Sequence, residues 1–296
     1  MCLGLAPDSC CRDEDNDQAV ELENVLSRSG VALRSKLLMS VRGLVEFLSR
    51  GIVLRRQLPE EFGGAQIFVT PEAGLRYWYT DLRRVDGMLF RMARELVAVN
   101  HVVWDIGANV GLFSFSAAAL AGSNGLVLAV EPDLWLAQLV ARSARTLGAR
   151  SQPGAPISTL CAAVSERNSI SQLEIADRAR SANHLADVDG STQSGGARNL
   201  QHTVTLSLDF LLDFFPSPNV LKIDVEAAEF RVLCGAHKLL RTVRPVIWCE
   251  VAPENQESVG ELLRANGYRV YAAALEPAKR TELRRASWDT LAIPIP

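Results

Sequence analysis

Short apolar runs and amphipathic stretches alternate along the chain from about residue 100 to the C-terminus. The runs have the length and composition of buried strands, and the stretches between them carry apolar residues at helical spacing. Strands that alternate with helices predict a mostly parallel sheet with helices on both of its faces. Strands are expected near 102–106, 126–131, 157–164, 219–224, 244–251 and 268–273, and helices over 112–120, 133–147, 226–241 and 254–266.

The region before this alternation divides into two parts. Residues 1–28 are polar and acidic, a composition that favours a disordered tail. Residues 29–98 form an N-terminal accessory region, in which 66–69 is expected to be a short strand and 86–98 a helix. The main domain is therefore expected over residues 99–296.

The accessory region begins with an amphipathic helix in basic surroundings. Apolar residues recur at helical spacing between Val31 and Leu48, and six arginines and lysines lie within residues 31–56. We expect this helix to pack on the rest of the chain or on another subunit. In the second case the protein would be a homo-oligomer. The alternative is peripheral contact of residues 31–56 with an anionic membrane surface.

Residues 165–202 interrupt the alternation with a long polar connection. Such a connection in a compact domain is typically either functional or a tolerated surface loop, and both interpretations stay open. Part of it, residues 171–175, alternates as a strand does. Because it follows the third strand, it is expected on the carboxyl side of the sheet, where ligands bind, as a lid or substrate-recognition insert.

The composition excludes several classes of protein. Of the 296 residues, 48% are hydrophobic and the net charge is −3, so a sizeable core is expected and a basic nucleic-acid-binding face is not. No apolar run is long enough for a transmembrane helix, and the acidic N-terminus lacks the basic start of a secretory signal. The six cysteines form no C-x-x-C pair, so we expect reduced thiols in a cytoplasmic protein.

The stretch 102–111 carries the strongest chemical signal. An apolar run ends at Asp105, passes through a turn with Gly107 and Gly111, and opens into a helix. This strand–turn–helix geometry brings backbone N–H groups close to a small ligand. Glu131 ends the next apolar run, twenty residues after Gly111, where an acidic residue accepts hydrogen bonds from a ribose diol. The unit therefore predicts a nucleotide-type ligand.

The form of the turn narrows the choice of ligand. It reads D-x-G-x-N-x-G, without the G-x-G-x-x-G of dinucleotide enzymes or the lysine of a P-loop. This form resembles the first motif of class I S-adenosylmethionine-dependent methyltransferases. The resemblance implies S-adenosylmethionine as cofactor, with Asp105 holding the loop or meeting the amino group of the ligand. It implies that a side chain at position 107 would fill the space of the ligand. The expected cofactor-binding residues are Asp105, Gly107, Ala108, Asn109, Gly111, Glu131 and Pro132.

A second segment makes the resemblance more specific. Residues 220–235 are similar to the K-x-D-V-E-G-x-E-x-x-V-L-x-G signature of FkbM-type methyltransferases, and further motifs extend the similarity to about 65–275. The resemblance implies a Rossmann-like sheet of seven strands, the last of them antiparallel and supplied by 288–293. The chain departs from the signature at Ala227, where the family usually has glycine, and at Ala228, where a polar residue is common.

Four acidic and basic residues near the ends of two strands are the candidates for catalysis. Asp224 is expected to orient or deprotonate the acceptor, while Lys222 and Glu226 set its charge and Glu250 faces them from the next strand. The alternative is a structural network of ion pairs. Two carboxylates, Asp224 and Glu250, are too few to predict a metal site. His184 and His202 in the insert are alternative bases.

These observations lead to one favoured function and two alternatives. The resemblance implies an S-adenosylmethionine-dependent methyltransferase that methylates a hydroxyl of a sugar, glycan or secondary metabolite, so the partner is a small-molecule or glycan acceptor. The first alternative is a catalytically weak or inactive cofactor-binding module that acts through protein partners. The second is another α/β nucleotide enzyme, which the missing G-x-G-x-x-G disfavours.

Overall fold

The computed structural model describes residues 41–147, 154–188 and 195–296. The chain has two compact units, Met1–Leu48 and Ser49–Pro296. In the first unit, helix α2 (Val41–Leu48) carries an ion pair in which Arg42 Nε donates to Glu46 Oε1 at 2.8 Å. The tail expected over residues 1–28 and the beginning of the amphipathic helix lie outside the described residues. The remaining description concerns the second unit.

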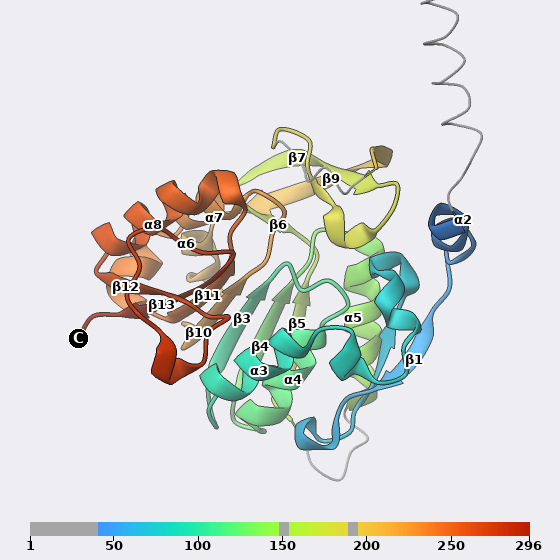
Figure 1. Ribbon diagram of the computed structural model, residues 1–296, viewed down its shortest axis with the longest axis horizontal. Coiled ribbons are helices and arrows are strands. Elements are labelled where there is room, and N and C mark those ends of the chain that lie inside the picture. Colours follow the sequence, from blue (N-terminus) through green and yellow to red (C-terminus); the bar gives the residue numbers. More distant parts are fainter. Residues whose placement is uncertain (1–40, 148–153, 189–194) are drawn as a thin grey trace, which may run out of the picture. The chain divides into compact units, whose positions relative to one another are not determined.

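A seven-stranded sheet is the centre of the second unit (Figure 1). Its strand order is β12-β13-β11-β10-β3-β4-β5, and only β13 runs antiparallel to its neighbours. This arrangement confirms the predicted mostly parallel sheet and its last antiparallel strand. The strands are β3 (Val102–Ile106), β4 (Leu126–Val130), β5 (Ile157–Leu160), β10 (Val220–Ile223), β11 (Val246–Glu250), β12 (Tyr268–Ala272) and β13 (Asp289–Pro294).

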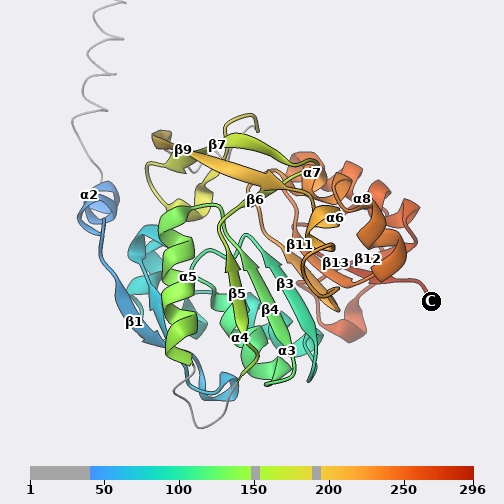
Figure 2. The ribbon, with the colours of Figure 1, turned by 180° about the vertical axis from the view of Figure 1, so that it is seen from behind.

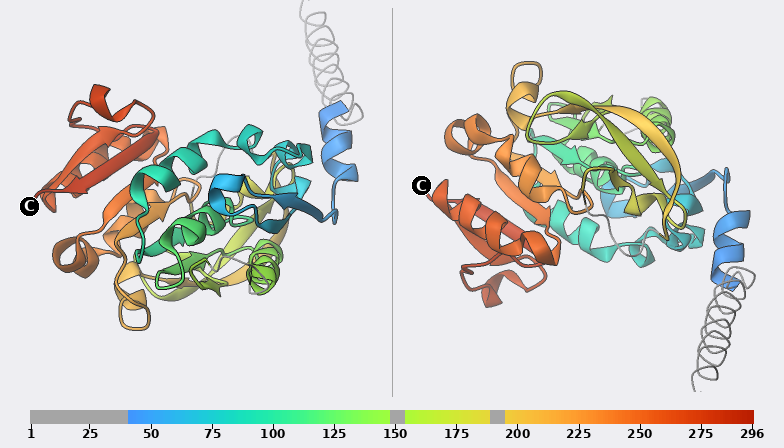
Figure 3. Two further views of the ribbon diagram at one scale, coloured as in Figure 1. Left: turned by 90° about the horizontal axis from the view of Figure 1, so that it is seen from below. Right: turned by 90° about the horizontal axis from the view of Figure 1, so that it is seen from above.

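Helices cover both faces of this sheet, as the alternation predicted (Figure 3). Strand side chains point alternately to the two faces, so Val103 and Val127 join one apolar cluster while Trp104 and Leu128 join the other. The first cluster is covered by α3 (Gly87–Leu96), α4 (Leu112–Ala121) and α5 (Leu134–Leu147), and the second by α6 (Leu208–Leu211), α7 (Glu229–Cys234) and α8 (Gln256–Ala265).

The segment before the sheet packs against its helices within the same unit. Strands β1 (Leu54–Gln57) and β2 (Gln66–Val69) form an antiparallel pair, which confirms the strand predicted over 66–69. Phe68 N donates to Ser143 Oγ of α5 at 2.8 Å, so this pair is fixed to the core. The helix predicted over 86–98 is α3, and Asp86 caps it by accepting from Met88 N and Leu89 N.

The insert forms a sheet of its own. Strand β7 (Ser169–Ala176) pairs with β9 (Ala197–Leu206), and β6 (Ala163–Val164) and β8 (His184–Leu185) complete the order β6-β9-β7-β8. The strand predicted near 171–175 is therefore confirmed within β7. Figures 1 and 2 place β7 and β9 at the end of the main sheet toward which β3, β4 and β5 point. The insert thus lies on the carboxyl side of the sheet.

Two predicted elements are wrong in extent. The strand predicted over 157–164 is divided, because β5 belongs to the main sheet and β6 to the insert sheet. The single helix predicted over 226–241 is broken into a turn, α7, and a π-helical turn over Leu239–Val243. Ala227 has a φ of 58°, which is incompatible with a right-handed helix, so α7 begins only after this residue.

The left-handed conformation of Ala227 is expected to lower the stability of the folded protein. An alanine in this region is strained by roughly 1–2 kcal/mol, and glycine avoids that strain while losing roughly 0.5–1 kcal/mol in backbone entropy. Ala227→Gly is therefore expected to stabilise the protein by up to about 1 kcal/mol, measured as a higher urea midpoint at an unchanged slope. Ala228→Gly is the control, because Ala228 has a φ of −100° and should only lose stability. A lower midpoint for Ala227→Gly would contradict the strain.

The described residues include three of the six cysteines. Cys161, Cys234 and Cys249 carry free thiols, and the other three cysteines lie outside the described residues. Within 41–147, 154–188 and 195–296, no helix combines the length and the apolar character that crossing a bilayer requires.

Candidate functional site

The carboxyl ends of β3 and β10 meet at a buried lysine. Lys222 is 3% exposed and pairs in register with Asp105 on the neighbouring strand. Its Nζ lies 3.0 Å from Asp105 Oδ1 and 3.2 Å from Asp224 Oδ2, and it donates to the carbonyl oxygen of Gly107 at 2.8 Å. Burial alone would lower the pKa of Lys222, but Asp105 and Asp224 outweigh it and raise that pKa above its ordinary value. The ammonium therefore stays charged and joins two carboxylates.

The two carboxylates differ in their access to solvent. The Asp105 side chain is fully buried and also accepts from Ser114 Oγ at 2.5 Å, whereas the Asp224 side chain is 35% exposed. Asp105 therefore ties β3 to α4 and to Lys222, which favours the loop-holding alternative for this residue. Asp224 is the member of the group that can reach a ligand.

The glycine-rich loop uses most of its backbone N–H groups internally. Gly107 N and Ala108 N donate to Val130 O at 2.9 and 3.0 Å, and Gly111 N donates to Ala108 O at 2.7 Å. Contacts to a ligand must therefore come from side chains, carbonyls and the start of α4. Helix α4 begins at Gly111 without a side-chain cap, which suits a negatively charged ligand group at its N-terminus.

The structure shows a steric reason for glycine at position 107 within the protein itself. Gly107 has a φ of +77°, and a Cβ there would lie 1.8 Å from the carbonyl oxygen of Asp224. A side chain at position 107 would thus collide with the end of β10, and its effect on the space of a ligand stays a prediction. At Gly111, a Cβ would lie 2.7 Å from the Phe115 ring. Both glycines are required by packing of the protein itself.

Glu131 lies at the carboxyl end of β4 and holds the two loops together. Its Oε2 accepts from Asn109 N at 2.7 Å and its Oε1 from Asp133 N at 2.9 Å, and the residue is 5% exposed. Burial raises the pKa of Glu131 to about 7. Pro132 follows it, and its carbonyl accepts from Gln201 Nε2 at 2.6 Å. Each carboxylate oxygen keeps a further lone pair for a ligand hydroxyl.

The residues at this end of the sheet fit a nucleoside with an amino-acid tail. Glu131 is suited to two hydroxyls, and the uncapped start of α4 is suited to a carboxylate. Among the described residues, the Oδ1 atom of Asn109 is buried without a hydrogen-bond partner. Such an atom is costly unless a ligand or water satisfies it, so the loop fits a bound polar ligand.

Glu250 lies at the end of β11 with two carboxyl neighbours that sequence reasoning missed. The Asp224 charge and burial raise the pKa of Glu250 to about 9, and Asp289 and Asp86 add to this shift. Asp289 is in register with Glu250, because antiparallel β13 starts where parallel β11 ends. The sequence could have indicated Asp289, because the last strand predicted over 288–293 was expected to be antiparallel. Asp86 comes from the accessory region. The only sequence signal for it was its position at the start of the helix predicted over 86–98.

A buried aromatic residue from the accessory region also belongs to this neighbourhood. Tyr77 is 6% exposed and interacts electrostatically with Asp86, Lys222 and Asp224. Arg56 fixes its backbone by donating to the carbonyls of Tyr77, Trp78 and Tyr79. The accessory region therefore contributes to the same end of the sheet as Asp224.

Glu226 interacts electrostatically with Asp224 and Glu229. Burial raises its pKa to about 7, with further contributions from Asp224 and Glu229. Glu229 accepts from Asn255 Nδ2 at 2.7 Å and serves the turn at the start of α7. In the described parts of the chain, no three histidine, cysteine, aspartate or glutamate side chains have a metal-binding arrangement.

The two histidines proposed as alternative bases belong to the insert sheet. His184 Nε2 lies 3.6 Å from Glu174 Oε2, and His202 contacts Gln172. All four residues lie on β7, β8 and β9. The structure therefore brings Asp105, Lys222 and Asp224 together with the glycine loop and Glu131, and keeps these histidines within the insert.

Comparison with known proteins extends this picture. A family model described as the methyltransferase FkbM domain matches residues 105–270. Over 203 residues the chain is 28% identical to the hexuronic acid methyltransferase AglP of Haloferax volcanii, a match that covers 68% of this chain and 76% of the relative.

Solved structures of methyltransferases are also similar to this chain. The FkbM methyltransferase of Methylobacillus flagellatus KT matches with a TM-score of 0.40 and 12% identity over 69% of this chain, but the match spans only 49% of that protein. The S-adenosylmethionine-dependent O-methyltransferase of Thermotoga maritima has a TM-score of 0.40 and 13% identity over 71% of this chain and 66% of its own. Because the family model covers more than half of the sequence and both of its motif regions, the chain belongs to the FkbM family of S-adenosylmethionine-dependent methyltransferases.

Proposed function

We propose that this protein transfers the methyl group of S-adenosylmethionine to a hydroxyl oxygen of a sugar, glycan or secondary metabolite. The observation that carries the proposal is the position of Asp224. Its carboxylate is 35% exposed, is paired with buried Lys222, and follows the strand next to the glycine loop. A carboxylate in this position is suited to receive or orient a hydroxyl proton.

The cofactor side is formed by the first two strand ends. We assign Gly107, Ala108, Asn109 and Gly111 to the methionine and sugar parts of the ligand, and Glu131 with Pro132 to the ribose side. The uncapped α4 N-terminus and the unpartnered Oδ1 of Asn109, among the described residues, support this assignment. When bound, S-adenosylmethionine supplies a methyl group activated by the adjacent sulfonium. The protein has to align an acceptor with it and accept one proton.

The charges on the acceptor side support a neutral hydroxyl as the methylated group. Asp224, Glu250, Asp289 and Asp86 lie within electrostatic range of one another, and Lys222 is already shared between Asp224 and Asp105. A carboxylate acceptor would meet the carboxylate of Asp224, whose partner Lys222 is already shared with Asp105. The name of the Haloferax relative says that it acts on hexuronic acid. We take from it only the class of acceptor, a sugar.

The alternative is a cofactor-binding module with little or no turnover. The observation that favours it is the strained Ala227, two residues from Glu229 and three from Asp224, at a signature position that usually has glycine. A turn displaced by this side chain would misplace Asp224. Turnover separates the two candidates, because both of them bind the cofactor.

The test is a transfer assay with a labelled methyl donor and matched sugar acceptors. We would compare a neutral methyl hexoside with the methyl glycoside of the corresponding hexuronic acid, each with and without the protein. The proposal predicts label on a hydroxyl of the neutral sugar and less on the uronate. Label on the uronate carboxyl would contradict the hydroxyl assignment, and cofactor binding without label on any of the acceptors would favour the binding module.

The raised carboxyl pKa values predict a fall in stability with rising pH. In the folded protein the pKa of Glu250 is about 9 and those of Glu131, Glu226 and Glu229 are about 7, above the ordinary value of 4.5. The folded state therefore binds more protons than the unfolded state between pH 4.5 and 9, and stability decreases across this window.

Melting temperatures of the cofactor-free protein measure this effect. We expect Tm to fall from about pH 5 to about pH 9, and Glu250→Gln to flatten the part of the curve above about pH 7. A wild-type curve that does not fall, or a Glu250→Gln curve parallel to that of the wild type above neutral pH, would be inconsistent with the buried carboxyls.

A further inference from the structure

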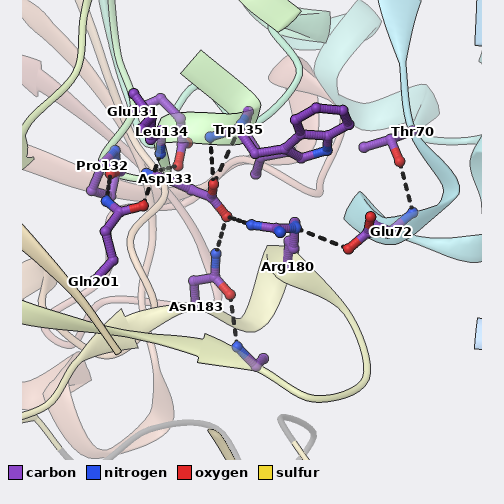
Figure 4. Close-up of polar contacts among 12 residues, drawn as sticks. Thr70, Glu72, Glu131, Pro132, Asp133, Leu134, Trp135, Arg180, Asn183 and Gln201 are labelled. Carbon is purple, nitrogen blue, oxygen red and sulfur yellow. Dashed lines mark hydrogen bonds and ion pairs between the residues drawn. The ribbon is translucent and has the colours of Figure 1, made fainter. Parts of the chain in front are cut away.

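The insert holds the loop that follows β4 at two points (Figure 4). Asn183 Nδ2 donates to Asp133 Oδ2 at 2.7 Å, and the Arg180 guanidinium forms an ion pair with the same oxygen. Gln201 Nε2 donates to the carbonyl of Pro132 at 2.6 Å, and its Oε1 accepts from Leu134 N at 3.2 Å. We call Arg180, Asn183 and Gln201 the loop clamp. They fasten both the side chain and the backbone of one short loop.

Asp133 connects the loop clamp to the candidate ribose residue. Its N–H donates to Glu131 Oε1 at 2.9 Å, and its Oδ1 caps α5 by accepting from Trp135 N at 2.9 Å. The residue is fully buried, and the Arg180 guanidinium compensates its carboxylate. Displacing the Asp133 side chain would also move the N–H that orients the Glu131 carboxylate.

Arg180 has a second carboxylate partner in the accessory region. Its Nε donates to Glu72 Oε2 at 3.0 Å, while Glu72 Oε1 accepts from Gly51 N at 2.6 Å and Arg198 pairs with the same carboxylate. Burial would raise the pKa of Glu72, but the Gly51 N–H and the two arginines lower it below its ordinary value. The planar guanidinium thus bridges two ionised carboxylates from separate elements, which a lysine cannot do in the same way.

We propose that Arg180, Asn183 and Gln201 are positioning residues for S-adenosylmethionine. They hold loop 131–135 so that the Glu131 carboxylate is preset for the ribose, and the insert thereby sets the affinity for the cofactor. The proposal rests on the assignment of Glu131 to the ribose. It gives the insert a role at the cofactor, in addition to any contact with the acceptor.

The test is calorimetric titration of S-adenosylmethionine into the full chain and its variants, each shown to be folded by circular dichroism. Gln201→Ala and Arg180→Lys are expected to raise Kd about five- to tenfold, because the loop is less well held. Arg231→Ala is the control. Arg231 also pairs with an insert residue, Asp187, at 2.7 Å. Among the described residues it makes no hydrogen bond or ion pair with loop 131–135, so its loss should leave Kd within about twofold.

A double-mutant cycle distinguishes positioning from a general loss of structure. In a Glu131→Ala background, Arg180→Lys should have little further effect on Kd, because the residue through which it acts is gone. Equal Kd values for wild type, Gln201→Ala and Arg180→Lys, or the same fold-change of Arg180→Lys in both backgrounds, would overturn the proposal. The same titrations test the proposed cofactor site itself. If the wild-type protein does not bind S-adenosylmethionine, the assignment of that site is wrong, and this result differs from equal Kd values among proteins that bind.

Discussion

Asp224→Asn is expected to lower kcat for methyl transfer at least ~100-fold while changing the Kd of S-adenosylmethionine by less than about threefold. The substitution removes a proton acceptor but keeps the size and most hydrogen bonds of the side chain. Lys222 retains its ion pair with Asp105 at 3.0 Å, so the lysine stays compensated and the strand ends stay in place. The loss should therefore appear in turnover and not in cofactor binding.

A matched variant is available elsewhere in the chain. Asp213 pairs with Lys238 at 3.2 Å, the same separation as Asp224 and Lys222, but its side chain is 60% exposed. Asp213→Asn should leave both kcat and Kd unchanged, because an exposed pair contributes little. Full activity of Asp224→Asn would limit Asp224 to a structural role. A loss of cofactor affinity equal to the loss in kcat would place it on the cofactor side.

Gly107→Ala is expected to destabilise the protein by about 4 kcal/mol or more, enough to leave little folded protein. The added Cβ would lie 1.8 Å from the backbone carbonyl oxygen of Asp224. Neither atom can move without separating the ends of β3 and β10, which also carry Asp105 and Lys222. Thermal unfolding and the yield of folded protein measure the effect.

Gly122→Ala is the control that separates the steric collision from the strain of the backbone. Its φ of +68° is close to the +77° of Gly107, but a Cβ there meets nothing within 4 Å. Because Gly122 also has a ψ of 179°, a conformation that residues other than glycine rarely adopt, Gly122→Ala should cost only this backbone strain, roughly 1–3 kcal/mol. Similar losses for the two variants would mean that backbone conformation alone requires glycine at position 107. A stable Gly107→Ala protein that has lost only its cofactor affinity would favour the original interpretation, in which the side chain fills the ligand space.

Much of the sheet could be predicted from the sequence because its strands are nearly continuous apolar runs. Strands buried on both faces, such as β3 and β4, carry few polar residues, and helix α4 between them ends at Gly122. The antiparallel last strand followed from the family resemblance. The first residue of β13, Asp289, could have been placed beside Glu250 from the antiparallel direction of that strand.

The remaining features depend on contacts that periodicity does not encode. The break before α7 comes from the left-handed Ala227, a residue with high helix propensity that predicted a continuous helix. Tyr77 and Asp86 reach the Asp224 neighbourhood only because residues 49–98 of the accessory region belong to the same unit as the sheet. Arg180 bridges residues 47 and 108 positions away, and no local pattern indicates such a pair.

The roles of the individual residues and the domain limits at 28 and 98 stay predictions. We expect the cofactor at the carboxyl ends of β3 and β4, and Asp224 follows β10, the strand next to β3. The account therefore depends on one central claim, that Glu131 and the glycine loop receive S-adenosylmethionine.

Calorimetric titration of S-adenosylmethionine into the wild-type protein and into folded Glu131→Ala, with NAD as a control ligand, tests that claim most directly. The account predicts binding of S-adenosylmethionine to the wild type, no binding of NAD, and a Kd at least ~10-fold higher in Glu131→Ala, because two hydrogen bonds to the ribose are lost. Equal affinity of the wild type and a folded Glu131→Ala protein would contradict it.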